Sequence, residues 1–163
     1  MADDWVCNAS PVICLAKVGC SNLLMDLPNR LVVPAGVAGE IQAGPASDPG
    51  AQWIRGPGAV YVQSAPDPIR SVANWDLGLG ETQVIETAIS EGGLTVVVDD
   101  RVARNCAAAH GLRCIGTFGI IILAKNAGLV HEVRPLLAEL RAAGLRVDEP
   151  LAQRVLDLAG EGA

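Results

Sequence analysis

Acidic and amide side chains directly follow two apolar stretches of the sequence that are typical of buried strands. Asp99 and Asp100 come after LTVVV, residues 94–98, and Asn8 comes after the first apolar stretch, residues 5–7. In an open sheet of parallel strands, ligands bind outside the carboxyl ends of the strands. These three side chains are therefore candidates for one site.

Two further acids approach the same edge of the predicted sheet from helices. Glu81 lies in the first turn of a helix predicted over residues 79–91, on the same side as its apolar stripe. Glu40 lies beside Val37 and Ile41, the inward-facing residues of a shorter predicted helix. Both carboxylates are therefore predicted to approach the sheet.

Several carboxylates at one place need a compensating positive charge. Burying a carboxylate without a partner costs on the order of several kcal/mol, and hydrogen bonds alone do not offset the mutual repulsion of a group of them. A hard divalent cation that prefers oxygen ligands, Mg²⁺ or Mn²⁺, suits such a cluster. The pattern therefore predicts metal-assisted chemistry on a phosphoryl group.

Each candidate also has an ordinary structural interpretation. Glu81 could be an acid that the helix dipole stabilises, and Glu40 could be a solvated residue near a helix end. Asp99 or Asp100 could be a helix N-cap, and Asn8 could be a turn residue. Their joint position favours the metal site. We expect one aspartate of the pair to cap the helix and the other to face Glu40 and Glu81.

The remaining pattern predicts the elements that position these residues. Strands are predicted at residues 5–7, 31–33, 94–98 and 113–115, with a weaker candidate at 59–62. Helices are predicted over residues 10–18, 35–43, 79–91, from the aspartate pair to 110, and over 117–126, 131–143 and 149–158. Ser10, before Pro11, is predicted to be the N-cap of the first helix. Residues 44–50 and 64–76 are predicted loops.

The alternation of strands and helices predicts an α/β fold, namely a three-layer α/β/α arrangement with a central parallel sheet. The length of 163 residues suits a single domain, residues 1–163. Because 50% of the residues are apolar and only 3% aromatic, the core must consist of Val, Leu, Ile and Ala. The net charge of −6 argues against a generally basic nucleic-acid-binding surface, so a polyanionic partner would need a local patch or a bound cation.

The cysteines and the apolar runs indicate the compartment. The five cysteines show no Cys-x-x-Cys spacing, and Cys7, Cys14 and Cys114 lie within apolar stretches, which predicts structural free thiols. The start of the chain lacks the pattern of a signal peptide, and the longest apolar run, residues 119–124, is too short to cross a bilayer. We therefore expect a soluble, cytoplasmic protein without a membrane segment.

Five segments of the chain resemble those of the PIN-domain ribonucleases: NASPVICLAKVG, VPAGVAGEI, LGLGETQVIETAISEG, VVVDDRVAR and GLRCIGTFGIIILAKNAGL. The chain looks most like the prokaryotic VapC-type branch, whose members act as toxins of toxin–antitoxin pairs. The resemblance covers roughly residues 5–147 and implies cleavage of RNA with Mg²⁺ or Mn²⁺. The family's acidic positions fall on Asn8, Glu40, Glu81 and the Asp99–Asp100 pair, where the register slightly favours Asp100.

The same resemblance implies contacts with the substrate. The family's small hydroxyl residue, two positions after its first acid, matches Ser10. Thr117 opens the helix after the last predicted strand, and helix N-termini favour anions. Arg101 and Arg104 are among the few cations predicted to lie near the acidic edge, because they follow the aspartate pair at the start of a predicted helix. The predicted reaction is the hydrolysis of an RNA phosphodiester by a water whose pKa the metal lowers.

One departure from the family pattern supports a second hypothesis. The family's first residue is usually Asp, whereas Asn8 offers an amide oxygen without the negative charge. The alternative is therefore a catalytically weak or silent PIN fold that binds RNA or a protein. A receiver-type signalling module is a third hypothesis, but its acidic pair would follow the first strand, and here the pair comes late.

Partners are expected on the toxin interpretation. A small antitoxin protein would cover the acidic cleft. The last helices carry two apolar stripes, which are Val133, Leu136, Leu137 and Leu140 in the first and Leu151, Val155 and Leu158 in the second. We expect most of these residues to be core, while the rest could form a homodimer face.

Overall fold

The computed structural model describes residues 2–162 and contains a five-stranded sheet in which every pairing is parallel. The strands are β1 (Asp4–Cys7), β2 (Arg30–Pro34), β3 (Val62–Gln63), β4 (Thr95–Val97) and β5 (Cys114–Ile115). Their order in the sheet is β3-β2-β1-β4-β5, so β1 lies in the centre. The predicted central parallel sheet is confirmed.

Helices connect the strands and extend beyond the last one. They are α1 (Ala9–Lys17), α2 (Leu23–Asp26), α3 (Ala35–Gln42), α4 (Pro49–Arg55), the short 3₁₀ helix η1 (Pro57–Tyr61), α5 (Arg70–Ala73), α6 (Leu79–Glu91), α7 (Arg101–Ala109), α8 (Thr117–Asn126), α9 (Val133–Ala142) and α10 (Glu149–Leu158). Among residues 2–162, none of these helices is both long and apolar enough to cross a membrane.

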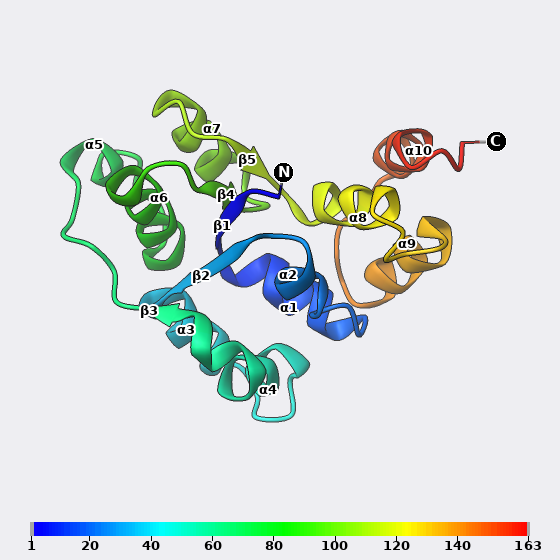
Figure 1. The fold of residues 1–163 in the computed structure, drawn as a ribbon, viewed down its shortest axis with the longest axis horizontal. Helices are drawn as coiled ribbons and strands as arrows, with labels where there is room; N and C mark the ends of the chain where they lie inside the picture. Colours follow the sequence, from blue (N-terminus) through cyan, green and yellow to red (C-terminus); the bar gives the residue numbers. More distant parts are fainter. Residues whose placement is uncertain (1, 163) are drawn as a thin grey trace.

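The helices form a layer on each side of the sheet, as the α/β/α prediction requires. Figure 1 shows α5, α6 and α7 on one side, and α1, α2 and α8 on the other. Helix α6 packs on β1, β2 and β4, while α3 contacts both α1 and α6. Helices α9 and α10 lie beyond α8, at the C-terminal end of the molecule (Figure 1). Helix α3 therefore joins the two layers beside the sheet.

The centre of the sheet is made of β-branched side chains that are fully buried. Val6 of β1 pairs with Val32 of β2 and with Val96 of β4, and none of the three is exposed. Full burial of such a side chain stabilises the fold by roughly 1.5–3 kcal/mol. The five cysteines are free, and burial raises the pKa of the Cys7 thiol, which agrees with the predicted structural role.

The first helix begins differently from the prediction. Ser10 is not the N-cap: the helix starts at Ala9, Asn8 occupies the N-cap position, and Asn8 makes no side-chain capping bond. The physical reason is that the Ser10 hydroxyl donates a hydrogen bond to Asp99, 3.1 Å away. The hydroxyl that the local pattern predicts to cap the helix thus binds a residue distant in the sequence instead.

Other short elements also differ from the prediction. Residues 59–61 belong to η1 rather than to a strand, and β3 starts only at Val62. The predicted loop over 44–50 contains the start of α4, where the Asp48 side chain accepts hydrogen bonds from Gly50 and Ala51. The predicted loop over 64–76 contains α5, and the sequence pattern missed α2. All are too short for a periodic pattern to reveal.

Candidate functional site

Asn8 and Asp99 follow neighbouring strands at the same edge of the sheet. Cys7 of β1 pairs with Val97 of β4, and the Asn8 backbone N–H donates to the Val97 carbonyl at 3.0 Å. The carboxyl ends of parallel strands meet at one edge. The structure therefore brings the end of β1 and the Asp99–Asp100 pair together, as expected from the sequence.

Asn8 contacts Glu81 across this edge. The side chain of Asn8 is 3% exposed, and its Nδ2 donates to Glu81 Oε1 at 3.1 Å. Its Oδ1 is buried and has no hydrogen-bond partner among the described residues. A buried polar atom without a partner costs free energy, roughly 1–3 kcal/mol. Asn8 Oδ1 is therefore an acceptor that a cation or another donor would satisfy.

Two glycines in the segment LGLGE allow the other carboxylates to approach the backbone. The Gly80 N–H donates to Glu40 Oε1 at 2.7 Å, which joins α3 to the start of α6. A Cβ at Gly80 would lie 2.6 Å from Glu40 Oε2, and one at Gly78 would lie 2.5 Å from Glu81 Oε2. Both distances are far below a normal contact, so the two positions require glycine while these carboxylates stay in place.

Asp99 accepts hydrogen bonds at both of its carboxylate oxygens. Its Oδ1 accepts from the Thr117 backbone N–H at 2.7 Å, and its Oδ2 accepts from the hydroxyls of Thr117, at 2.7 Å, and Ser10, at 3.1 Å. Thr117 is fully buried. Ser10 and Thr117, expected from the resemblance to contact substrate, therefore bind Asp99 and join α1 and α8 to the end of β4.

Asp100 caps α7 and also borders the acidic cluster. Its Oδ1 accepts from the Ala103 N–H at 2.9 Å, which makes it the N-cap. It also lines a hollow of about 250 Å³ together with Glu81 and Asp76. One aspartate caps the helix, as expected, and it is Asp100, the one preferred for the metal. The oxygens of the other, Asp99, accept from Thr117 and Ser10. Asp99 holds the helices, and Asp100 combines the cap with the position beside Glu81.

The two arginines expected to bind substrate lie at the start of α7 and are exposed. Arg104 Nη1 donates to the Val98 carbonyl at 3.3 Å, so its guanidinium lies close to the end of β4. It also lines a second hollow, of about 600 Å³, together with Asp99. No hydrogen bond or ion pair holds the Arg101 side chain to another described residue.

The residues fit a hard divalent cation in the chemistry of their donors. Asn8, Glu40, Glu81 and Asp100 offer oxygen atoms, and the unpartnered Asn8 Oδ1 is one acceptor that the fold leaves unsatisfied. Within residues 2–162, no three His, Cys, Asp or Glu side chains lie close enough together to hold a metal ion. Hydrogen bonds hold Glu40, Glu81 and Asp99 at separate places, so binding would require the carboxylates to move.

Sequence reasoning missed several residues around this edge. Asp76, which lines the smaller hollow, has a positive φ of 52°, a conformation that favours Gly, Asn or Asp. Glu86 is 3% exposed, and its Oε1 accepts from the Ile69 N–H at 2.7 Å, which holds the segment before α5. Phe118 and Arg146 line the larger hollow. The repeated glycines of LGLGE were the one local signal that carboxylates lie close to the backbone here.

The comparisons with known proteins agree with this arrangement. A family model described as a PIN domain matches residues 4–161, nearly the whole chain. No curated protein and no solved structure matches it. PIN domains are in general nucleases that act on nucleic acid, and they usually use divalent metal ions. The parallel sheet, the acids at its carboxyl edge and the matched family model together show that the chain belongs to the PIN-domain family.

Proposed function

We propose that this protein is a metal-dependent endoribonuclease, the toxin component of a prokaryotic toxin–antitoxin system. One observation carries the proposal: Asn8, with its buried and unpartnered Oδ1, lies against Glu81 at the sheet edge where Asp100 also lies, between β4 and α7. Oxygen donors around an unsatisfied buried acceptor suit a cation that binds a phosphodiester. The small hollow beside them is open to a substrate.

The metal is proposed to be Mg²⁺ or Mn²⁺, with Asn8, Glu40, Glu81 and Asp100 as its protein ligands. Such a cation, when bound, lowers the pKa of a water and offsets the negative charge that develops on phosphate oxygens. Capping does not disqualify Asp100, because only its Oδ1 is engaged by the helix. Asp99 is proposed to act as a positioning residue, because Thr117 and Ser10 already occupy both of its oxygens.

A second candidate function has its own supporting observation. The Asn8 amide donates to Glu81 Oε1 at 3.1 Å and so stabilises this carboxylate in part without a cation. An aspartate at this position would repel Glu81 and favour a metal more strongly. The alternative is therefore a catalytically weak or silent PIN fold that binds RNA or a protein.

A small antitoxin protein is the proposed partner, and it would cover the acidic edge. We also propose that the protein forms a homodimer and is located in the cytoplasm. In the last helices, Val133, Leu136, Leu137, Leu140 and Val155 are buried in the core, as expected. Leu158 is 59% exposed and is the stripe residue that a second copy could cover.

The test of the nuclease compares cleavage of single-stranded RNA by the wild type and by Glu81→Gln and Asp100→Asn, with Mg²⁺ or Mn²⁺ and with EDTA. We expect wild-type cleavage that EDTA abolishes, and a fall of at least about tenfold in each variant, since the loss of even a residue that supports a metal ligand typically costs about 10–100-fold. Asn caps a helix about as well as Asp, so Asp100→Asn should keep its thermal stability.

The matched control is Glu91→Gln at the other end of α6, where Glu91 pairs with Arg30 at the surface. This variant should cleave like the wild type. Cleavage that neither Glu81→Gln nor Asp100→Asn reduces would refute the proposed site. Absence of any metal-dependent cleavage, together with no Mn²⁺ binding by calorimetry, would favour the silent PIN fold.

A further inference from the structure

The larger hollow of the molecule lies beside the acidic edge and is completed by the C-terminal helices. Its volume is about 600 Å³, within the range of roughly 300–1,000 Å³ that small-molecule sites occupy. Asp99, Arg104 and Phe118 line it from the end of β4, α7 and α8, while Leu145, Arg146 and Leu151 come from the connection to α10 and from α10 itself. The sequence did not predict a site residue after Thr117 in the chain, so Phe118, Arg146 and Leu151 are new candidates.

The hollow adjoins the proposed cleavage site through neighbouring residues. Asp99 lines this hollow, and Asp100, the next residue, lines the smaller one with Glu81. Thr117 bonds Asp99 through both its N–H and its hydroxyl, and Phe118 is the following residue of α8. Consecutive residues therefore border the two hollows, which places both within reach of one strand of nucleic acid.

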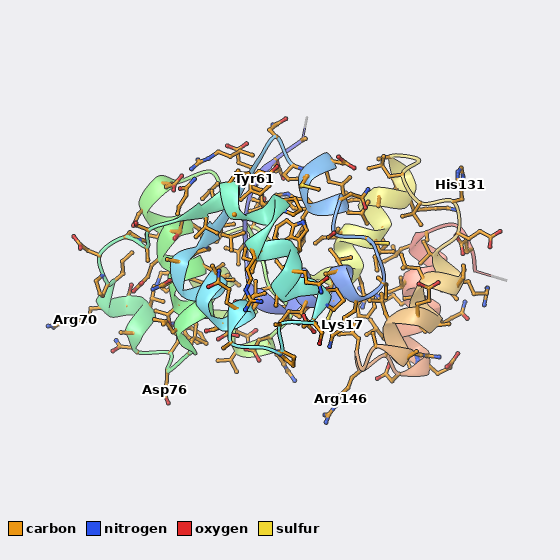
Figure 2. All side chains as sticks on the ribbon, turned by 90° about the horizontal axis from the view of Figure 1, so that it is seen from below. Lys17, Tyr61, Arg70, Asp76, His131 and Arg146 are labelled. Carbon is orange, nitrogen blue, oxygen red and sulfur yellow. The ribbon has the colours of Figure 1, made fainter. Side chains whose placement is uncertain are left out.

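The charges of the hollow suit a phosphate backbone. Neither Arg104 nor Arg146 has a carboxylate partner within 4.0 Å among the described residues. Other surface arginines in this part of the chain are also unpaired, and what distinguishes these two is that both line the same hollow. Figure 2 shows the Arg146 side chain reaching outward on the same edge of the view as Asp76, which lines the smaller hollow. The hollow also has one carboxylate, Asp99, whose oxygens accept hydrogen bonds from Ser10 and Thr117. In a chain of net charge −6, two guanidiniums against this one carboxylate form a local patch for an anion.

The apolar part of the hollow suits a nucleobase. Phe118 is the single phenylalanine of the chain and is half-buried, with Leu145 and Leu151 also lining the hollow. Three glycines, at 116, 119 and 144, contribute no side chain to its wall. An aromatic ring beside cations is the arrangement that proteins use to stack a base while they bind the backbone. A base must leave a helical stack to do this, which selects single-stranded nucleic acid.

We propose that the hollow lined by Phe118, Arg104 and Arg146 is a nucleotide subsite for single-stranded RNA: the Phe118 ring stacks a base, and the two arginines bind flanking phosphates. The inference rests on the proposed ribonuclease function and adds to it a place that holds the strand. The C-terminal helices α9 and α10 then have a function in substrate binding, because their connection supplies Arg146 and Leu145.

The test measures binding without cleavage. Fluorescence anisotropy in EDTA follows the binding of a labelled single-stranded RNA of about ten nucleotides, a length within the range bound by single-strand-binding modules. We expect Phe118→Leu to weaken binding about tenfold and Phe118→Tyr to restore it, because the tyrosine ring stacks equally well. Arg146→Gln should weaken binding and lower the slope of log K against log salt by about 0.7, the value for one contact with a single strand.

Matched controls lie on the same helices. Leu123→Ala changes an exposed apolar residue of α8, and Arg154→Gln removes an exposed arginine of α10; neither lines the hollow. Both should bind RNA like the wild type. The subsite would be overturned by RNA binding that Phe118→Leu leaves unchanged, by a preference for duplex RNA, or by no binding at all. It would also be overturned if only the binding of a protein partner depended on Phe118.

The outcomes separate this inference from the nuclease itself. RNA binding that depends on Phe118, in a protein that shows no metal-dependent cleavage, would support the subsite and refute the nuclease. Cleavage by the wild type, with RNA binding that is independent of Phe118 and Arg146, would support the nuclease and refute the subsite.

Discussion

The two polar atoms of the Asn8 side chain differ in their hydrogen bonding. Its Nδ2 donates to Glu81, while its Oδ1 is buried without a partner. The buried acceptor costs stability, and the amide donor removes part of the repulsion that an aspartate would bring to Glu81. On the proposed metal site, Asn8 would therefore affect both the affinity for the metal and the stability of the metal-free fold.

Replacement of Asn8 by aspartate tests this balance. In Asn8→Asp we expect tighter Mn²⁺ binding, by about tenfold, because a ligand gains a negative charge. The metal-free variant should unfold at a lower temperature, since a buried carboxylate then faces Glu81 without a donor. Calorimetry with Mn²⁺ and thermal unfolding with and without the metal measure both effects. An unchanged Mn²⁺ affinity would argue against Asn8 as a ligand.

At the scale of the element, α3 has two glycines in contrasting surroundings. A Cβ at Gly39 would meet nothing within 4 Å, whereas one at Gly36 would lie 2.4 Å from Gln83 Oε1. The Gly36 N–H also donates to that oxygen at 2.7 Å, which joins α3 to α6. The same helix therefore holds one glycine that costs stability and one whose replacement would displace the Gln83 side chain.

Alanine substitutions at these two positions should act in opposite directions. Gly39→Ala should raise the free energy of unfolding by about 0.5–1 kcal/mol, because alanine favours the helix and fits without a clash. Gly36→Ala should lower it, because the Gln83 side chain must leave its hydrogen bond. Chemical denaturation measures both values. Stabilisation in Gly36→Ala, or a loss in Gly39→Ala, would contradict the packing described for α3.

At the scale of the whole molecule, Glu161 attaches the end of the chain to α8 and α9. Its carboxylate pairs with Lys125 at 2.9 Å and accepts from the backbone N–H groups of Val133 and Arg134 at 2.7 and 3.0 Å. The Lys125 ammonium, followed by these N–H groups, lowers the pKa of Glu161 to about 2. This carboxylate therefore joins the segment after α10 to the end of α8 and the start of α9.

This contact predicts a specific loss of stability in acid. Because the folded pKa is lower than the unfolded one, the contribution of Glu161 is complete above about pH 5 and is lost as the pH falls towards 2. Glu161→Gln should lower the free energy of unfolding at neutral pH by about 1 kcal/mol, and its stability should depend less on pH in that range. Denaturation across the pH range measures this.

The control for Glu161 is Glu132→Gln, since Glu132 is exposed and makes no capping bond at the start of α9. This variant should retain the pH dependence of the wild type. An acid profile of Glu161→Gln that coincides with the wild-type profile would remove Glu161 as the cause.

The sequence by itself determined the long elements and which polar residues follow the central strands. Apolar periodicity predicted residues 79–91, 117–126 and 149–158 as helices, and the structure has helices with these bounds. The oxygen-rich residues after β1 and β4 were also evident, because a strand end and a helix start are local features. Periodicity cannot reveal helices of four residues such as α2 and α5, whose formation depends on packing.

Only the tertiary structure decided what each side chain of the site does. Ser10 is separated from Asp99 by 89 residues and Asn8 from Glu81 by 73, so no local pattern could show that Ser10 holds an aspartate instead of capping its helix. The roles within the aspartate pair, and the hollow that Phe118 shares with Arg146, likewise depend on how distant segments pack. Local propensity acts over a few residues, whereas hydrogen-bond partners and cavities arise only when the layers have assembled.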